Sequence, residues 1–215
     1  MTAADAGAVV PVSGSAPPHP VRRVTGRDRV RGYSTAWWGV ATVIATEAMI
    51  FLCLLATYFF LRAASKEWPL GGIELPELKQ SSIYSVVLIG SSVPVIWGER
   101  AIERGDVTRL KIGLALAWVM GAAFLYHTVD DFLKLHFGWR DNAYGSIFYV
   151  TVGLHALHVL VGLAISSVVQ LKVWLGRVNE EHHKTVEIFS LYWHFVDGVW
   201  IFVFLSLIVS PHFGR

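Results

Sequence analysis

Five long apolar runs dominate the chain, and short polar connections separate them. The runs cover 36–61, 81–98, 112–129, 144–171 and 187–209. About 20 apolar residues cross the hydrocarbon core of a bilayer, and backbone groups in lipid must find their partners within a helix. The pattern therefore predicts an all-α membrane protein, a five-helix transmembrane bundle over residues 36–210. A proline inside the second run, at position 94, predicts a kink there.

The distribution of Lys and Arg predicts the orientation of this bundle. The N-terminal segment and the second and fourth connections hold twelve of these residues, and the opposite side holds six. Because cytoplasmic connections carry the excess of positive charge, the N-terminus is expected inside and the C-terminus outside. Residues 1–35 combine small residues and prolines with a basic run and show no signal-peptide core. They are expected to form a flexible cytoplasmic tail.

Composition narrows the function classes. Only 16% of the residues are charged, against roughly 25% in a soluble domain. The single cysteine, Cys53, excludes an internal disulfide and any multi-cysteine metal site. A net charge of +2 gives no reason to expect a nucleic-acid partner.

Five ionisable residues are placed in the middle of the predicted spans. They are Glu47 in the first span, His155 and His158 in the fourth, and His194 and Asp197 in the fifth. The two histidines of the fourth span are three residues apart, as are His194 and Asp197 of the fifth, so each pair shares a helix face. Glu47 lies about 17 Å into its helix, where an ionised side chain costs about 2.5–3.5 kcal/mol. We therefore expect Glu47 to face the bundle and to pair with a histidine of the fourth span.

The five residues alone leave two interpretations open. A His/His/Glu set resembles the ligands of metal sites and the groups of proton relays. The same residues also suit a structural polar cluster that fixes helix packing or meets a lipid head group. Small residues favour close helix packing in any case: Gly113, Ala117 and Gly121 repeat every four positions in the third span, and Gly162 and Ser166 do so in the fourth.

The last two spans resemble a known family. Residues 141–162, DNAYGSIFYVTVGLHALHVLVG, and 192–204, YWHFVDGVWIFVF, are similar to the signatures of cytochrome c oxidase subunit III. Glu47 matches the membrane-embedded glutamate of that family, and 101–106 is similar to the family's second connection. The resemblance covers 37–204, and five spans instead of seven resemble the short bacterial form. Subunits III of quinol oxidases and the accessory subunit of nitric oxide reductases share this architecture.

The sequence departs from the family pattern at two places. Thr128, Asp131 and Phe132 stand where the family often has glutamine, glutamate and tyrosine, and Gly198 replaces a branched residue. These changes leave the choice between cytochrome c and quinol as electron donor open. A stand-alone transporter or metal-binding membrane protein is the distant alternative, although a transporter would show internal repeats or broken helices.

The resemblance implies a division of labour within an oxidase complex. Haem and copper are expected in partner subunits, and none is expected in this chain, which holds no catalytic residue. Oxidase subunit I, which reduces oxygen and pumps protons, is the expected main contact, with subunit II in the same complex. Glu47, His155, His158, His194 and Asp197 would then form a structural, lipid-binding or proton-linked cluster and hold no metal. Bound phospholipid and a bacterial plasma membrane are further implications.

Overall fold

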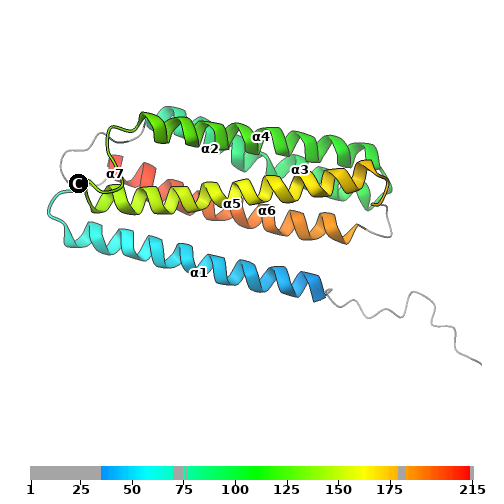
Figure 1. The fold of residues 1–215 in the computed structure, drawn as a ribbon, viewed down its shortest axis with the longest axis horizontal. Helices are drawn as coiled ribbons and strands as arrows, with labels where there is room; N and C mark the ends of the chain where they lie inside the picture. The colour runs from blue at the N-terminus through cyan, green and yellow to red at the C-terminus, as the bar shows by residue number, and fades with distance from the viewer. Residues whose placement is uncertain (1–34, 70–74, 76, 179–182, 214–215) are drawn as a thin grey trace, which may run out of the picture. The chain divides into compact units, whose positions relative to one another are not determined.

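The computed structural model describes residues 35–69, 75, 77–178 and 183–213, so the predicted tail lies outside the described residues except for Thr35. The described residues form helices and no strand. Five helical stretches are long and apolar enough to cross a membrane, which confirms the predicted five-helix bundle. They are α1 (Thr35–Ala64), α2 with α3 (Leu78–Gly90 and Ser92–Ile102), α4 (Val107–Lys134), α5 (Ala143–Trp174), and α6 with the π-helical η2 and the short α7 (Lys184–Val203, Phe204–Val209 and Ser210–Phe213) (Figure 1).

Capping residues extend the helices beyond the apolar runs. The Asp106 side chain accepts a hydrogen bond from the Arg109 backbone nitrogen at 3.0 Å, so α4 begins five residues before the predicted start. Asn142 caps α5 in the same way through the Gly145 nitrogen at 2.8 Å. A side-chain acceptor at this position satisfies a backbone N–H that the helix itself cannot.

The second span is interrupted at Ser91, three residues before Pro94, as the sequence predicts. The missing proline N–H removes one helical hydrogen bond and favours a break in the preceding turn. The α3 segment that follows packs tightly against α4. A Cβ atom added to Gly113 would lie 2.4 Å from the Pro94 carbonyl oxygen, so only glycine allows the two backbones to approach this closely.

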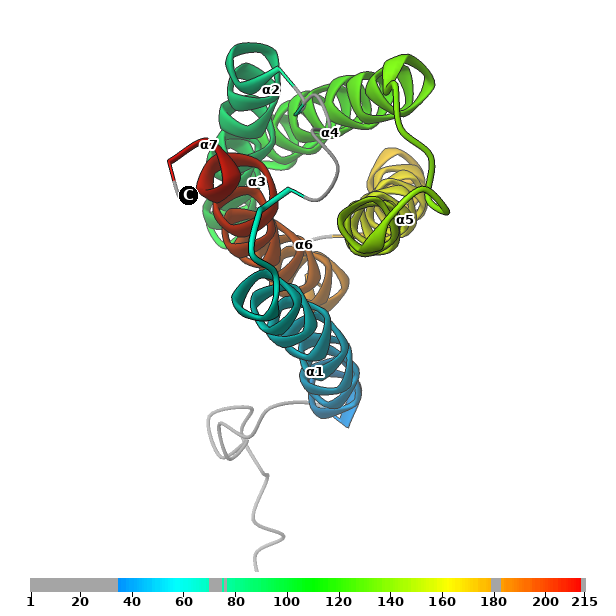
Figure 2. The same ribbon diagram turned by 90° about the vertical axis from the view of Figure 1, so that its left-hand side faces the viewer.

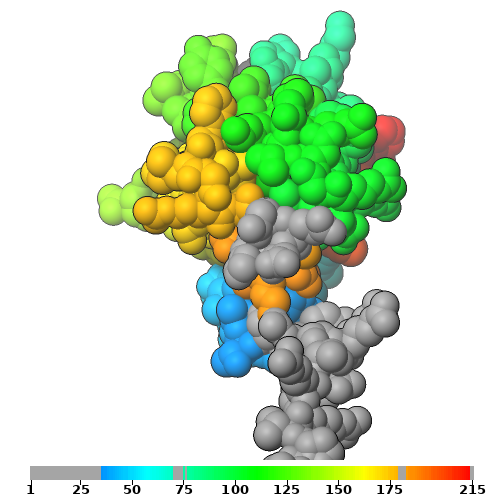
Figure 3. Space-filling model, turned by 90° about the vertical axis from the view of Figure 1, so that its right-hand side faces the viewer, coloured from blue at the N-terminus to red at the C-terminus, as the bar shows by residue number. Residues whose placement is uncertain are grey.

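The helix α6 occupies the centre of the bundle, and α1 lies at its edge (Figure 2). α6 contacts α1, α3 and α5, whereas α1 packs chiefly against α6 and α5. Only 6% of the α1 span is buried within the chain, against 39–44% for the other four spans. From the end of the bundle where α1 begins, α1 is seen below the ends of α4 and α5 (Figure 3). Most of the α1 surface is therefore not covered by the other described helices.

Candidate functional site

The five predicted residues do not form one cluster. Glu47 and His158 meet between α1 and α5, whereas His194 and Asp197 on α6 meet a serine of α3. His155 belongs to neither group. The structure thus divides the predicted site into two polar contacts and one buried ring.

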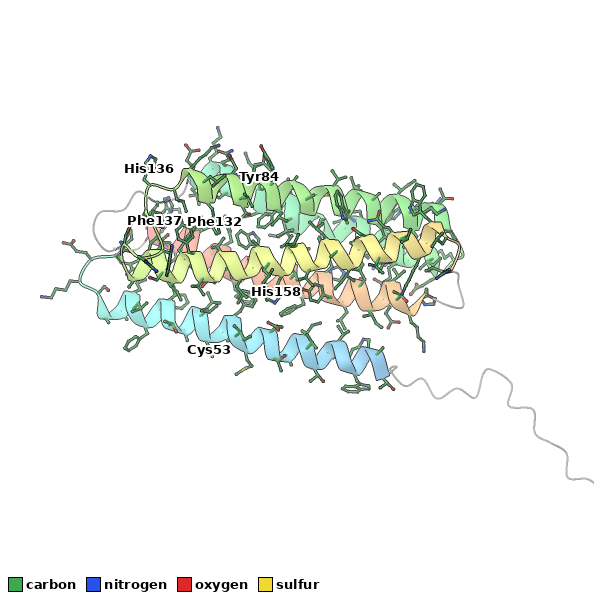
Figure 4. All side chains as sticks on the ribbon, in the orientation of Figure 1. Cys53, Tyr84, Phe132, His136, Phe137 and His158 are labelled. Atoms are coloured by element: carbon green, nitrogen blue, oxygen red, sulfur yellow. The ribbon has the colours of Figure 1, made fainter. Side chains whose placement is uncertain are left out.

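Glu47 pairs with His158, as the sequence analysis predicts. The Glu47 Oε2 and His158 Nε2 atoms are 3.2 Å apart, and His158 Nδ1 lies 2.8 Å from the Leu154 carbonyl oxygen. The Tyr192 hydroxyl donates to the carbonyl oxygen of His158 at 3.2 Å. His158 is labelled beside α1 in the view with side chains (Figure 4). These contacts join α1, α5 and α6 in the middle of the bundle.

The hydrogen bonds of His158 determine where its proton lies. A carbonyl oxygen only accepts, so Nδ1 carries a hydrogen and donates it to Leu154. With a neutral ring, Nε2 is then an acceptor, and the contact with Glu47 requires a protonated carboxyl group. With a charged ring, Nε2 donates to a carboxylate. Either state places one proton on the contact between Glu47 and His158.

Ser92 connects His194 and Asp197. Its Oγ lies 2.9 Å from His194 Nδ1 and donates to Asp197 Oδ2. A serine hydroxyl has one hydrogen, so His194 Nδ1 must donate to Oγ. Asp197 is 4% exposed, and its other oxygen makes no hydrogen bond among the described residues. This contact connects α3 with α6 and uses the polar groups for packing.

His155 is buried among aromatic rings. It is 1% exposed, and its ring stacks on Trp200 with centroids 4.6 Å apart. Phe124 and Phe51 approach it edge-on at 5.9 and 6.4 Å. Neither ring nitrogen makes a hydrogen bond in the described part of the chain. The expected contact between Glu47 and a histidine of the fourth span is therefore confirmed for His158. His155 takes no part in it.

Sequence reasoning missed the serines that oppose the tryptophans of α6. Trp193 Nε1 donates to Ser91 Oγ at 2.9 Å, and Trp200 Nε1 donates to Ser85 Oγ at 3.0 Å. The tryptophans are seven residues apart and lie on one face of α6. The serines are six apart, and Ser91 stands at the interruption between α2 and α3. The seven-residue spacing of the tryptophans was the available signal, and the break at Ser91 hid its counterpart in the second span. A further contact joins α6 with α3, where Ser190 Oγ donates to Glu99 Oε2 at 2.6 Å.

A sixth ionisable site was also missed. His127 lies within α4, is 4% exposed, and has its Nε2 3.2 Å from Asp131 Oδ2. His127 was not included among the ionisable residues of the predicted spans. The hydropathy pattern ended the third span at Val129, whereas α4 continues to Lys134 and brings this histidine well inside the helix.

The geometry does not support a metal site at Glu47, His155 and His158. Within the ranges that the structure describes, the one group of three or more potential ligands is His127, Asp130 and Asp131. The observed contacts are interhelical, because Glu47 with His158 connects α1 and α5 and Ser92 with Asp197 connects α3 and α6.

The predicted small-residue faces are also observed. A Cβ atom added to Gly121 would lie 2.7 Å from the Trp193 ring, and one added to Gly162 would lie 2.8 Å from the same ring. Ala117 and Ser166 are buried on the same helices. The indole of α6 therefore fits between α4 and α5 because both lack side chains there.

Comparison with known proteins identifies the family. The family described as cytochrome c oxidase subunit III matches residues 24–210, which is most of the chain. The chain belongs to the cytochrome c oxidase subunit III family. Membership places it in an oxidoreductase complex of the membrane, in agreement with the five apolar helices.

Individual proteins of the subunit III family are also similar to this chain in sequence. A protein of Thermostichus vulcanus named cytochrome c oxidase subunit 3 is 35% identical over 176 residues, covering 81% of this chain and 87% of that protein. The protein of the same name from Synechocystis is 36% identical, with 78% and 72% covered. The one from Lumbricus terrestris is 30% identical, with 79% and 68% covered. The match thus takes up a larger share of the first bacterial relative than of the animal one.

Proposed function

We propose that this chain is the non-catalytic subunit III of a bacterial cytochrome c oxidase, in which partner subunits hold haem and copper, reduce oxygen to water and pump protons. The observation that carries this proposal is the way in which polar groups within the spans contact one another. Two such contacts cross helix interfaces: Glu47 with His158, and Ser92 with Asp197. Groups used in this way stabilise a bundle. Subunit I is the proposed main contact, with subunit II in the same complex.

The proposed topology has the N-terminus in the cytoplasm and the C-terminus outside. With five spans, the N-terminus and the C-terminus lie on opposite sides of the membrane. The excess of Lys and Arg is found at the end of the bundle where α1 begins. These basic residues include Arg100, Arg104 and Lys172, which would attract anionic lipid head groups. The connection 100–111 also holds Glu103 and Asp106, whose carboxylates would collect protons near the uptake side of subunit I.

One affinity tag fused after Arg215 tests both proposals. In detergent, the tagged chain is expected to purify with a haem-containing subunit, whose absorption spectrum is read directly. In intact spheroplasts, an antibody is expected to reach the tag from outside. A tagged chain that purifies without haem would contradict the oxidase proposal. A tag that becomes accessible only after lysis would contradict the topology and leave the oxidase proposal standing.

We further propose that a phospholipid chain occupies a groove between α1, α5 and α6. The groove has a volume of about 660 Å³, and its walls are almost entirely apolar. Val43, Leu157, Val161 and Ile188 are among its lining residues, and the Glu47–His158 pair lies within it. An apolar groove that opens to the bilayer suits an acyl chain, and α1 leaves it open because so little of this helix is buried.

Filling the groove is expected to displace this lipid. Val161→Trp places an indole into the groove, whereas Val168→Trp adds the same ring to an exposed position of α5 outside it. Native mass spectrometry of the complex should show about one phospholipid fewer per chain for Val161→Trp than for Val168→Trp. Equal lipid counts in the two variants would contradict the proposal.

A further inference from the structure

The end of α4 brings three potential metal ligands together. His127, Asp130 and Asp131 each offer one ligand atom, and these three atoms lie within 4.8 Å of one another. The spacing i, i+3 and i+4 places all three on one helix face. Two ligands bound to one zinc ion at about 2.1 Å are separated by at most about 4.2 Å. Small rotations of the two aspartates would therefore bring the three atoms into one coordination sphere.

The state of His127 points independently to a ligand. Its Nε2 is buried and makes no hydrogen bond among the described residues, although Asp131 Oδ2 lies 3.2 Å away. The two atoms approach each other without the alignment that a hydrogen bond requires. Tyr84 of α2 stacks on the imidazole with centroids 4.0 Å apart and planes 20° apart, and so holds the ring in place. A fixed imidazole whose nitrogen lacks a hydrogen bond and faces a carboxylate is an arrangement that a cation completes.

The surroundings favour positive charge and leave room for a water ligand. Asp130 and Asp131 lie near the C-terminal end of α4, where the carbonyl groups of the helix attract cations. Glu77, at the start of α2, adds a negative charge within electrostatic range of Asp131. A cavity of about 20 Å³ borders His127 and Asp131, enough for one water molecule. Tyr84 and His136 are labelled at this end of the bundle (Figure 4).

We propose that His127, Asp130 and Asp131 bind a divalent cation of the zinc class at the end of the bundle where α4 ends. One imidazole nitrogen and two carboxylates suit zinc, whereas calcium and magnesium prefer ligand sets made of oxygen alone. Lys134, which pairs with Asp130, is exposed and would leave as the ion enters. The site is not a redox centre, so it is separate from the haem and copper proposed for the partner subunits. It departs from the sequence-based expectation that this chain holds no metal.

Zinc binding to the purified complex tests the site. The complex, freed of loosely bound metal with a chelator, is titrated with Zn²⁺, and zinc is counted per chain separately from copper. The unmodified complex is expected to bind one zinc more per chain than His127→Asn, and Asp131→Asn should raise the half-saturating concentration at least about tenfold. His212→Asn removes an exposed imidazole at the same end of the bundle and should leave binding unchanged.

The amount of haem that purifies with each variant shows whether the complex has assembled. Asp130→Asn and Asp131→Asn change partly exposed groups, so they decide the result if His127→Asn fails to assemble. Equal zinc binding in the unmodified complex and in the two aspartate variants would overturn the proposal. A loss that appears equally in His212→Asn would overturn it as well.

Discussion

The substitution Gly113→Ala is expected to destabilise the chain by about 3 kcal/mol, at the upper end of what overpacking costs. The new Cβ atom would lie 2.4 Å from the Pro94 carbonyl oxygen and 3.3 Å from the Gly98 Cα atom. Both are backbone atoms of α3, so no side-chain rotation can relieve the contact. The two helices must separate, and the tightest interface in the bundle opens.

Gly198→Ala is the matched control for this substitution. Gly198 lies in α6, and a Cβ atom added there meets nothing within 4 Å. Alanine also favours helix over glycine by about 1 kcal/mol, so this variant should be as stable as the original chain or slightly more so. Thermal unfolding of the purified complex and the recovery of assembled complex measure both effects. An unfolding midpoint shared by the two variants would show that α3 and α4 do not meet as described.

The membrane-spanning architecture was predictable because the hydrocarbon core of a bilayer admits few kinds of structure. Any span must be long, apolar and helical, so five runs in the sequence became five helical spans. The ends of the helices were harder to predict from the sequence, because capping groups set them independently of hydropathy. Asp106 and Asn142 begin α4 and α5 in this way.

The candidate site was predictable where depth and face decide the contact. Glu47 lies too deep to remain alone, and the fourth span offers histidines at a similar depth, so the sequence predicted a contact with one of them. The structure shows that it is His158. His155, three residues away, had the same sequence signal but lies among aromatic rings. A difference of less than one helical turn decides between the two, and this depends on the rotation of α5 against α6. Rotation is set by packing, and no single helix encodes it.

Packing at this level is clearest around Trp193, which leads to the second large expected effect. The side chain is 1% exposed, donates to Ser91, and lies over Gly121 and Gly162. Trp193→Ala should destabilise the chain by about 3–5 kcal/mol, because it leaves a large void where three helices meet. Unfolding of the purified complex measures the loss, and Trp174→Ala, an exposed tryptophan at the end of α5, should cost far less.

A double-mutant cycle separates the fit between this ring and its glycines from simple loss of volume. Gly121→Ala alone should cost about 1–3 kcal/mol, because its Cβ atom would lie 2.7 Å from the Trp193 ring. In the Trp193→Ala background the obstructing atoms are gone, so the same substitution should be neutral or partly fill the void. The expected coupling is about 1–3 kcal/mol, within the range for residues in contact. Additive effects would mean that the ring does not rest on Gly121, and that the small-residue face of α4 has another partner.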